Sequence, residues 1–251
     1  MSEAAAALYV YGVVSASTQP DGTGIGARPV ELVAERDVGA LASFVPAGEF
    51  GEAALRERLE DRAWLERTAR EHEDALERAL AATAVIPFRL CTVYESRDGL
   101  REFLSAHGPA LAGLLRRLDG RVELGVKTYF AEAQAATGEP QSGREYLLRR
   151  QREREAAEEA ARFKVECARA SHERLAAAAE EARANPPQPP ELSGRTDEML
   201  LNGAYLVRRD DRRLTDAVAE LESLYGPRGV TYEITGPWPP YNFVPPEVVG
   251  T

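Results

Sequence analysis

Histidine and cysteine are the residue types through which this chain could do chemistry, but their spacing does not favour it. His72 stands in the run His72-Glu73-Asp74-Ala75-Leu76, which lacks the second histidine of an H-E-x-x-H zinc site. Cys91 has no histidine close by in the sequence, and Cys91 and Cys167 lack the spacing of a metal site. We therefore predict a hydrogen-bonded structural His72, free thiols in a reducing cytoplasm, no catalytic residue and no metal.

A glycine cluster near the N-terminus could suggest a phosphate-binding loop. Gly22, Gly24 and Gly26 have the spacing G-x-G-x-G and are followed by Arg28-Pro29 and a second extended segment. A dinucleotide site needs G-x-G-x-x-G at the start of a helix, because the helix N-terminus holds the phosphate. The pattern therefore predicts a flexible surface loop and no cofactor.

The first half of the chain alternates between strand-like and helix-like patterns. Apolar and β-branched residues predict strands, and leucines at three- and four-residue steps predict helices, of which the second is kinked or split at Gly108-Pro109. The predicted strands are residues 8–14, 30–36, 40–45 and 85–94, and the predicted helices are residues 52–82 and 98–118. These elements indicate an N-terminal α+β domain over residues 1–118.

The second half, residues 119–251, is predicted to form another α+β domain, built around an unusually long helix. Residues 144–184 contain neither glycine nor proline, and Asn185-Pro186-Pro187 ends the run. A helix of about 40 residues at 1.5 Å per residue would be roughly 60 Å long. It fits either an exposed spacer or a surface for a partner helix. Residues 185–194 are predicted to be a proline-rich linker, residues 121–131, 200–209 and 230–235 strands, and residues 212–225 an amphipathic helix.

Charge and hydropathy narrow the class of protein. The 251 residues carry a formal net charge of −10, which argues against nucleic-acid and anionic membrane surfaces as partners. No apolar run approaches the length of a membrane span, and residues 2–7 lack a basic leader pattern. We expect a soluble, intracellular protein.

The C-terminal tail, residues 236–251, combines stiff prolines with the aromatic residues Trp238, Tyr241 and Phe243. Proline lowers the entropy that is lost on ordering, and the aromatic rings supply contact area. Such a tail either lies across its own domain or binds a partner.

Several of these segments together resemble one protein family. They are the opening strand LYVYGVV (residues 8–14), His72 with VIPFRLCTVY (85–94), NGAYLV (202–207) and TYEITGPWPPYNF (231–243). In this order they are similar to the gas vesicle protein GvpL/GvpF family, over nearly the whole chain. Members commonly carry Phe-Gly where this chain has Leu90-Cys91.

The resemblance implies two α+β domains, the first a modified ferredoxin-like sheet with helices and the second a small sheet with the long helix. It also implies an accessory, minor structural component of gas vesicles in the cytoplasm. Such a protein binds the major shell protein GvpA, possesses no enzymatic activity and assists vesicle nucleation and assembly, with other accessory gas vesicle proteins as further partners. We predict that contact with the shell subunit involves Phe88, Arg89, Trp238, Tyr241 and Phe243. The alternatives are a small-molecule-binding regulatory module on the ferredoxin-like sheet and, third, an enzyme.

Overall fold

The chain forms two compact units. The computed structural model describes residues 6–131, 142–189 and 195–246. The first unit comprises Met1–Glu123 and Trp238–Thr251, and the second comprises Leu124–Pro237. The aromatic tail, which we expected in the C-terminal domain, is thus grouped with the first unit.

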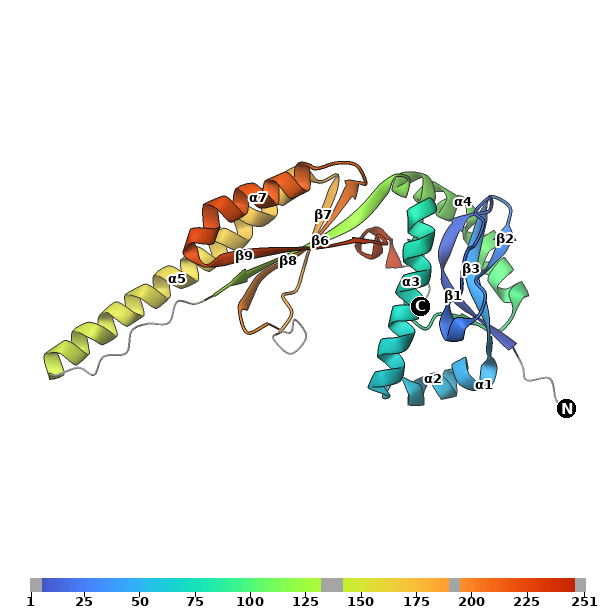
Figure 1. The fold of residues 1–251 in the computed structure, drawn as a ribbon, viewed down its shortest axis with the longest axis horizontal. Helices are drawn as coiled ribbons and strands as arrows, with labels where there is room; N and C mark the ends of the chain where they lie inside the picture. Colours follow the sequence, from blue (N-terminus) through green and yellow to red (C-terminus); the bar gives the residue numbers. More distant parts are fainter. Residues whose placement is uncertain (1–5, 132–141, 190–194, 247–251) are drawn as a thin grey trace. The chain divides into compact units, whose positions relative to one another are not determined.

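The sheet of the first unit is antiparallel and is centred on β1. Its strand order is β2-β3-β1-β4, and β5 also pairs with β1. Residues 7–14 of β1 are all buried, because the sheet is covered on both faces, by α3 (Arg62–Ala82) on one and α4 (Arg97–Leu118) on the other (Figure 1). The strands are β1 (Ala6–Ser15), β2 (Glu31–Glu35), β3 (Val38–Pro46), β4 (Ile86–Pro87) and β5 (Val93–Tyr94).

The helices of this unit differ from the predicted ones at two places. The predicted helix 52–82 is broken, because Asp61 caps a new helix by accepting hydrogen bonds from the backbone of Ala63 and Trp64. Of the predicted kink or split at Gly108-Pro109, the split is absent, because one helix runs through both residues. Proline has no N–H to donate to the carbonyl group four residues earlier, at Ser105. Pro109 lies on an exposed part of the helix, where water can bond that carbonyl group instead. The helices are α1 (Ala47–Phe50), α2 (Glu52–Arg58), α3 (Arg62–Ala82) and α4 (Arg97–Leu118), with short 3₁₀ turns η1 (Ile25–Ala27) and η3 (Tyr241–Phe243).

The predicted strand 85–94 is interrupted. β4 and β5 pair with β1, and Phe88 and Thr92 next to them still hydrogen-bond to the backbone of β1, but residues 89–91 leave the ladder in a turn. Cys91 has a φ of 64°, in the left-handed region, which no regular strand can contain. The prediction of one continuous strand over residues 85–94 is therefore wrong.

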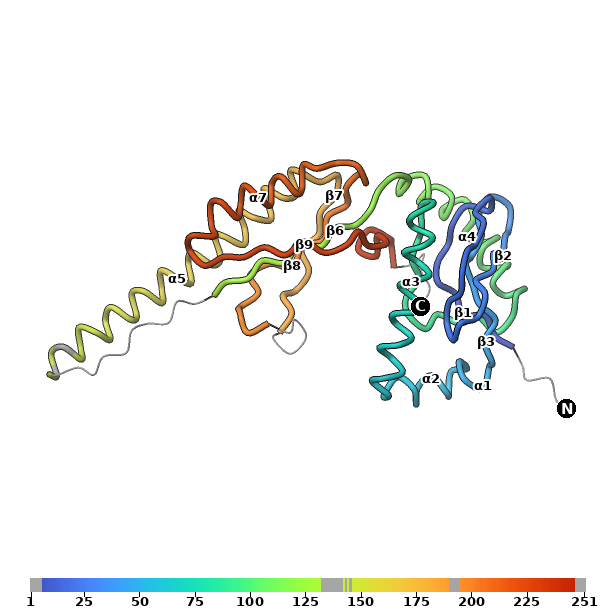
Figure 2. Tube along the Cα trace, in the orientation of Figure 1, coloured from blue at the N-terminus to red at the C-terminus, as the bar shows by residue number. Residues whose placement is uncertain are grey.

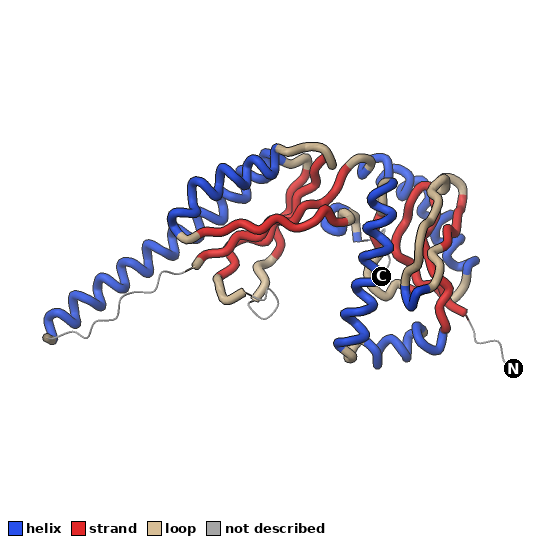
Figure 3. The backbone as a smooth tube through the Cα atoms, viewed as in Figure 1, coloured by secondary structure: helices blue, strands red, loops and turns tan. Residues whose placement is uncertain are grey.

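The second unit is an antiparallel sheet of order β7-β8-β6-β9. α5 packs against β7, β8 and α7, and the two helices run side by side on one face (Figure 3). The elements are β6 (Arg121–Phe130), α5 (Gly143–Ala178), β7 (Glu181–Asn185), β8 (Glu198–Arg208), α7 (Arg213–Tyr225), η2 (Gly226–Arg228) and β9 (Val230–Trp238).

The long helix is shorter than predicted. It ends at Ala178, and residues 181–185 form β7, which pairs with β8 from Glu181 opposite Leu206 onward. The segment predicted as a linker connects these two paired strands. Its Pro186 carbonyl accepts a hydrogen bond from Asn202 at 3.1 Å, so its first residues are part of the unit. Residues 190–194 lie outside the described residues.

Two buried tyrosines of β1 tie this strand to segments far away in the sequence. The Tyr11 hydroxyl donates to Ser43 Oγ at 2.9 Å and accepts the backbone N–H of Ile25 at 2.8 Å. A side chain at Gly24 would overlap that hydroxyl, and Gly26 donates its N–H to Glu71 on α3 at 2.9 Å. The glycine loop, predicted to be flexible, is fixed in place for this reason.

The Tyr9 hydroxyl forms a second link, between α3 and the turn 88–92. It contacts His72 Nδ1 at 2.9 Å and accepts the backbone N–H of Cys91 at 3.1 Å. The direction of the bond between Tyr9 and His72 follows the tautomer of the imidazole ring, because a hydroxyl oxygen can accept two hydrogen bonds and still donate its own proton. Burial lowers the pKa of His72 from 6.5 to about 4, which the nearby Phe88 carbonyl offsets only in part.

The low pKa of His72 makes the stability of the first unit depend on pH. Between pH 6.5 and 4 the unfolded state binds a proton that the folded state excludes, so the free energy of unfolding falls as pH falls. The loss approaches about 3 kcal/mol at pH 4.

Urea titrations test this prediction. A His72→Asn variant, which keeps an acceptor for Tyr9, should lose this pH-dependent part of the free energy of unfolding. Both tryptophans of the chain, Trp64 and Trp238, belong to the first unit, so their fluorescence reports it. Equal pH dependence in the two proteins would contradict the assignment.

Candidate functional site

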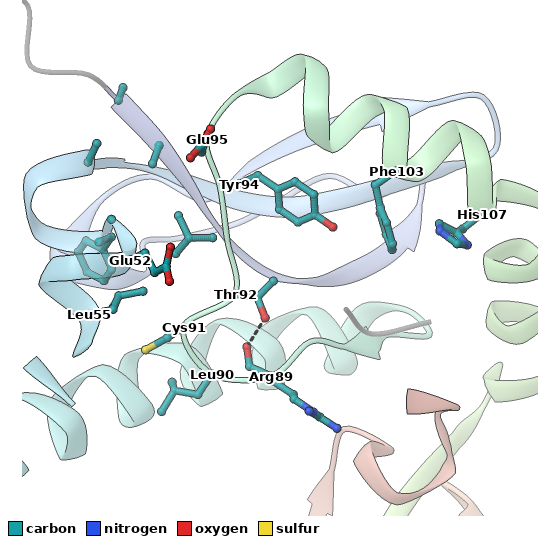
Figure 4. A pocket seen from close by; sticks show the side chains of 16 residues that line it. Glu52, Leu55, Arg89, Leu90, Cys91, Thr92, Tyr94, Glu95, Phe103 and His107 are labelled. Carbon is teal, nitrogen blue, oxygen red and sulfur yellow. Dashed lines mark hydrogen bonds between the residues drawn. The ribbon is translucent and has the colours of Figure 1, made fainter. Parts of the chain in front are cut away.

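One hollow of the first unit lies along β5, and we call it the β5 pocket. It has a volume of about 1040 Å³. Four segments line it: the start of β1, the α1–α2 region, residues 89–95, and one turn of α4 (Figure 4). Because the lining includes the turn 88–92, the shape of the pocket depends on the Tyr9 hydrogen bond to Cys91.

The pocket has apolar walls on both sides of β5. On the α4 side, Tyr94, Phe103 and His107 form a row, with ring centroids 5.9 Å and 4.7 Å apart. On the other side lie Phe50 and Leu55. Figure 4 shows Leu55 on one side of the segment 89–95, and Tyr94, Phe103 and His107 on the other.

The polar side chains of the lining include Glu52, Arg89, Cys91, Glu95 and His107. Burial raises the pKa of the Cys91 thiol to about 11, so it stays protonated at neutral pH and is a poor nucleophile. Within residues 6–131, 142–189 and 195–246, no three His, Cys, Asp or Glu side chains are grouped to hold a metal ion. The helices in these ranges are also too short or too polar to cross a membrane.

Of the predicted contact residues near this pocket, Arg89 lines it and Phe88 does not. Arg89 is exposed and reaches the rim. Phe88 is 0 % exposed, with its ring edge-to-face against Phe103 at 5.8 Å. Phe88 thus supports the aromatic wall from behind, while Phe103, which sequence reasoning missed, faces the pocket. The leucine-rich pattern of α4 gave no separate signal for it.

The other predicted residues lie on the tail, which is bound to its own unit (Figure 2). The Tyr241 hydroxyl donates to Glu73 Oε1 on α3 at 2.8 Å. Asn242 donates twice to the buried Glu123, from its backbone at 2.9 Å and from its side chain at 2.6 Å. Phe243 is 1 % exposed, and its carbonyl accepts from Arg117 at 3.0 Å. Of the two roles open to the tail, the structure therefore favours packing across its own unit for Tyr241 and Phe243. Trp238 remains half-exposed.

Burial also changes the pKa of Glu73, the carboxylate that accepts the Tyr241 hydrogen bond. The pKa of Glu73 is raised by burial, which the Tyr241 hydrogen bond only partly offsets, and Glu77 and Asp74 on the same helix raise it further. Glu73 Oε2 is buried without a hydrogen-bond partner among the described residues. The hydrogen bond from the Tyr241 hydroxyl thus offsets part of the cost of burying the Glu73 carboxylate.

Comparison with known proteins gives consistent matches. The family model described as "Gas vesicle synthesis protein GvpL/GvpF" matches residues 7–245. Gas vesicle protein L of Streptomyces sp. (strain CB03234) is 38% identical over 246 residues, which are 94% of this chain and 91% of the relative.

Solved structures show the same fold. The crystal structure of the gas vesicle protein GvpF from Anabaena sp. PCC7120 superposes with a TM-score of 0.67 at 18% identity, covering 95% of each chain. GvpF from Microcystis aeruginosa gives a TM-score of 0.65 at 20% identity, over 94% of this chain and 98% of the other. The α+β fold expected from the sequence is confirmed.

The left-handed conformation of Cys91 leads to a stability prediction. A residue with a Cβ pays a steric penalty of about 1–2 kcal/mol in this region, and glycine does not. We expect the Cys91→Gly variant to be more stable than Cys91→Ala by about 1 kcal/mol, although glycine ordinarily stabilises a folded chain less than alanine does. Urea denaturation of the two variants measures the difference. A more stable Cys91→Ala would show that the turn does not require this backbone conformation.

The Tyr241–Glu73 bond leads to a second prediction. Tyr241→Phe should lower the free energy of unfolding of the first unit by about 1–3 kcal/mol, because it removes the hydrogen bond to Oε1 of the partly buried Glu73 carboxyl group, whose other oxygen already lacks one. Tyr146→Phe, at an exposed position on α5, is the matched control and should change stability by no more than roughly 0.5 kcal/mol. Equal stability of the two variants would mean that the tail is not anchored by this hydroxyl.

Proposed function

Because this chain belongs to the GvpL/GvpF family of gas vesicle synthesis proteins, we propose that it binds the major shell protein GvpA and assists nucleation and assembly of gas vesicles. The observation that carries the proposal is the 38% identity to a gas vesicle protein L over 94% of the chain. We also propose that the protein acts in the cytoplasm and at the vesicle, as a minor component beside other accessory gas vesicle proteins.

Physical properties of the chain support such a role. A shell with a dry inner face requires an apolar subunit. That subunit aggregates unless its exposed apolar surface is covered before assembly. A carrier with a net charge of −10 stays soluble with such a cargo. The β5 pocket offers apolar walls on a rigid sheet edge, which is a suitable surface for covering an exposed segment.

The β5 pocket also supports a second candidate function, that of a small-molecule-binding regulatory module. Ligand sites are concave, largely apolar and carry a few polar groups, and the pocket has these features. At about 1040 Å³, however, it lies just above the range of roughly 300–1,000 Å³ that suits small ligands. A metabolite that raises the melting temperature of the protein would support the regulatory function instead.

Deletion of the gene in a vesicle-forming host tests the proposal. We expect electron microscopy to show no intact vesicles, or far fewer of them, and the wild-type gene to restore them. Normal vesicles in the deletion strain would contradict a role in assembly.

A pull-down tests contact through the tail. Trp238 and Tyr241 are both partly exposed, but the hydroxyl of Tyr241 is bonded to Glu73. Trp238→Ala should therefore reduce recovered GvpA by roughly fivefold, as expected for an aromatic interface anchor. Leu224→Ala, at a residue of the second unit that is 63 % exposed, is the control. Equal recovery with both variants, at equal melting temperature, would remove Trp238 from the contact surface.

A further inference from the structure

We propose that the β5 pocket binds an extended, apolar segment of the partner, which adds to the first sheet as a new strand beside β5. This inference rests on the proposed function, since the partner is the shell subunit. It goes further by specifying the conformation of the bound segment, the edge with which it pairs and the walls that it contacts.

The first observation is the position of β5 in the sheet. Within the described part of the chain, β5 pairs only with β1, and β1 pairs with β3 on its opposite side. Next to β5, the Thr92 carbonyl is directed inward and accepts the backbone N–H of Val10 at 2.9 Å. β5 is therefore an edge strand, and the outer backbone groups of such a strand can pair with an added chain.

The second observation is that the walls suit the two faces of a strand. Successive side chains of a strand point to opposite sides of the sheet. An added strand would place one set against Phe103 and Tyr94, and the alternate set against Phe50 and Leu55. A bound helix would present its apolar residues on one side and would leave one of these walls uncovered.

The third observation concerns charge. The carboxylates of Glu52 and Glu95 line the pocket together with the cationic Arg89. This rim disfavours an acidic occupant, and it disfavours a second copy of this chain, because pairing β5 with β5 would bring the same carboxylates together in a chain of net charge −10. The occupant is therefore apolar and neutral or basic.

The opposite edge of the sheet is formed by β2, which differs from β5 in carrying charged side chains. β2 carries Glu31 and Glu35, and Glu31 forms an ion pair with Arg97 at 3.0 Å. Charged side chains on an edge strand discourage pairing with another chain. The first sheet thus has one edge that carries charges along its strand and one that is bordered by apolar walls, and we place the added strand at the latter.

Matched substitutions on α2 separate this inference from the proposed function. Leu55→Asp puts a charge into one wall, whereas Leu59→Asp puts the same charge one turn further on, at a residue that is 47 % exposed and outside the lining. In pull-downs of GvpA, we expect Leu55→Asp to lower recovery by roughly tenfold and Leu59→Asp to leave it within twofold, at equal melting temperatures. Equal recovery with both would overturn the inference and keep the proposed function. Failure of the wild-type protein to recover GvpA would overturn both.

Backbone methylation tests whether the segment binds as a strand. Short overlapping peptides that cover the GvpA sequence are titrated against the full-length protein by fluorescence anisotropy, and those that bind are remade with single N-methylated amides. Successive amides of a strand point to opposite edges. We therefore expect methylation to weaken binding by at least roughly tenfold at every second position and to have little effect at the positions between. A uniform effect, no effect, or no bound peptide would overturn strand addition.

Discussion

The first unit depends on two phenol hydroxyls that lie in the middle of its central strand. Tyr9 and Tyr11 are both 0 % exposed, so their hydroxyl groups must find partners inside the protein. Each accepts a backbone N–H from an irregular segment, Cys91 in one case and Ile25 in the other. Each also contacts a side chain, His72 and Ser43 respectively. One strand thereby fixes two loops that have no regular secondary structure of their own to hold them.

The C-terminal tail also donates hydrogen bonds to polar side chains of the first unit. The buried carboxylate of Glu123 is satisfied by the backbone and side chain of Asn242, and Glu73 by the hydroxyl of Tyr241. In all these places an irregular segment supplies donors to a polar group of the core, and removing one donor would leave a buried acceptor unpaired. The loops and the tail therefore contribute to stability, and the pocket beside them keeps a defined shape.

This arrangement explains which features could be predicted from the sequence. The two-strand hairpin, the leucine-rich helices and the α+β class follow from local periodicity, and the family could be identified from short segments. The turn inside residues 85–94 could not be predicted from periodicity, because it depends on a hydroxyl 82 residues earlier in the chain. The one available signal was the glycine that the family commonly has at the position of Cys91, since a φ of 64° is a conformation that glycine adopts without strain. The end of α5 was missed for a similar reason, since residues 181–185 are held as a strand by pairing with β8.

The long helix α5 combines two physically different halves. Its C-terminal half is part of the fold of the second unit, with Cys167, Ser171 and Leu175 buried, and Ser171 is hydrogen-bonded to Tyr232 at 2.6 Å. Its N-terminal half is exposed over residues 151–159 and carries pairs such as Arg149–Glu153 and Arg154–Glu158 along its own surface. Both pairs place the cation before the anion, which is the less favourable order on a helix, and exposed pairs add little to stability. Tyr146, Leu147 and Leu148 nevertheless expose apolar surface near its start, where a spacer would need only polar residues. Successive helix residues do not share a face, so these three side chains form no single apolar stripe, and the two roles that the sequence left open for this helix, a spacer and a surface for a partner helix, both stay predictions.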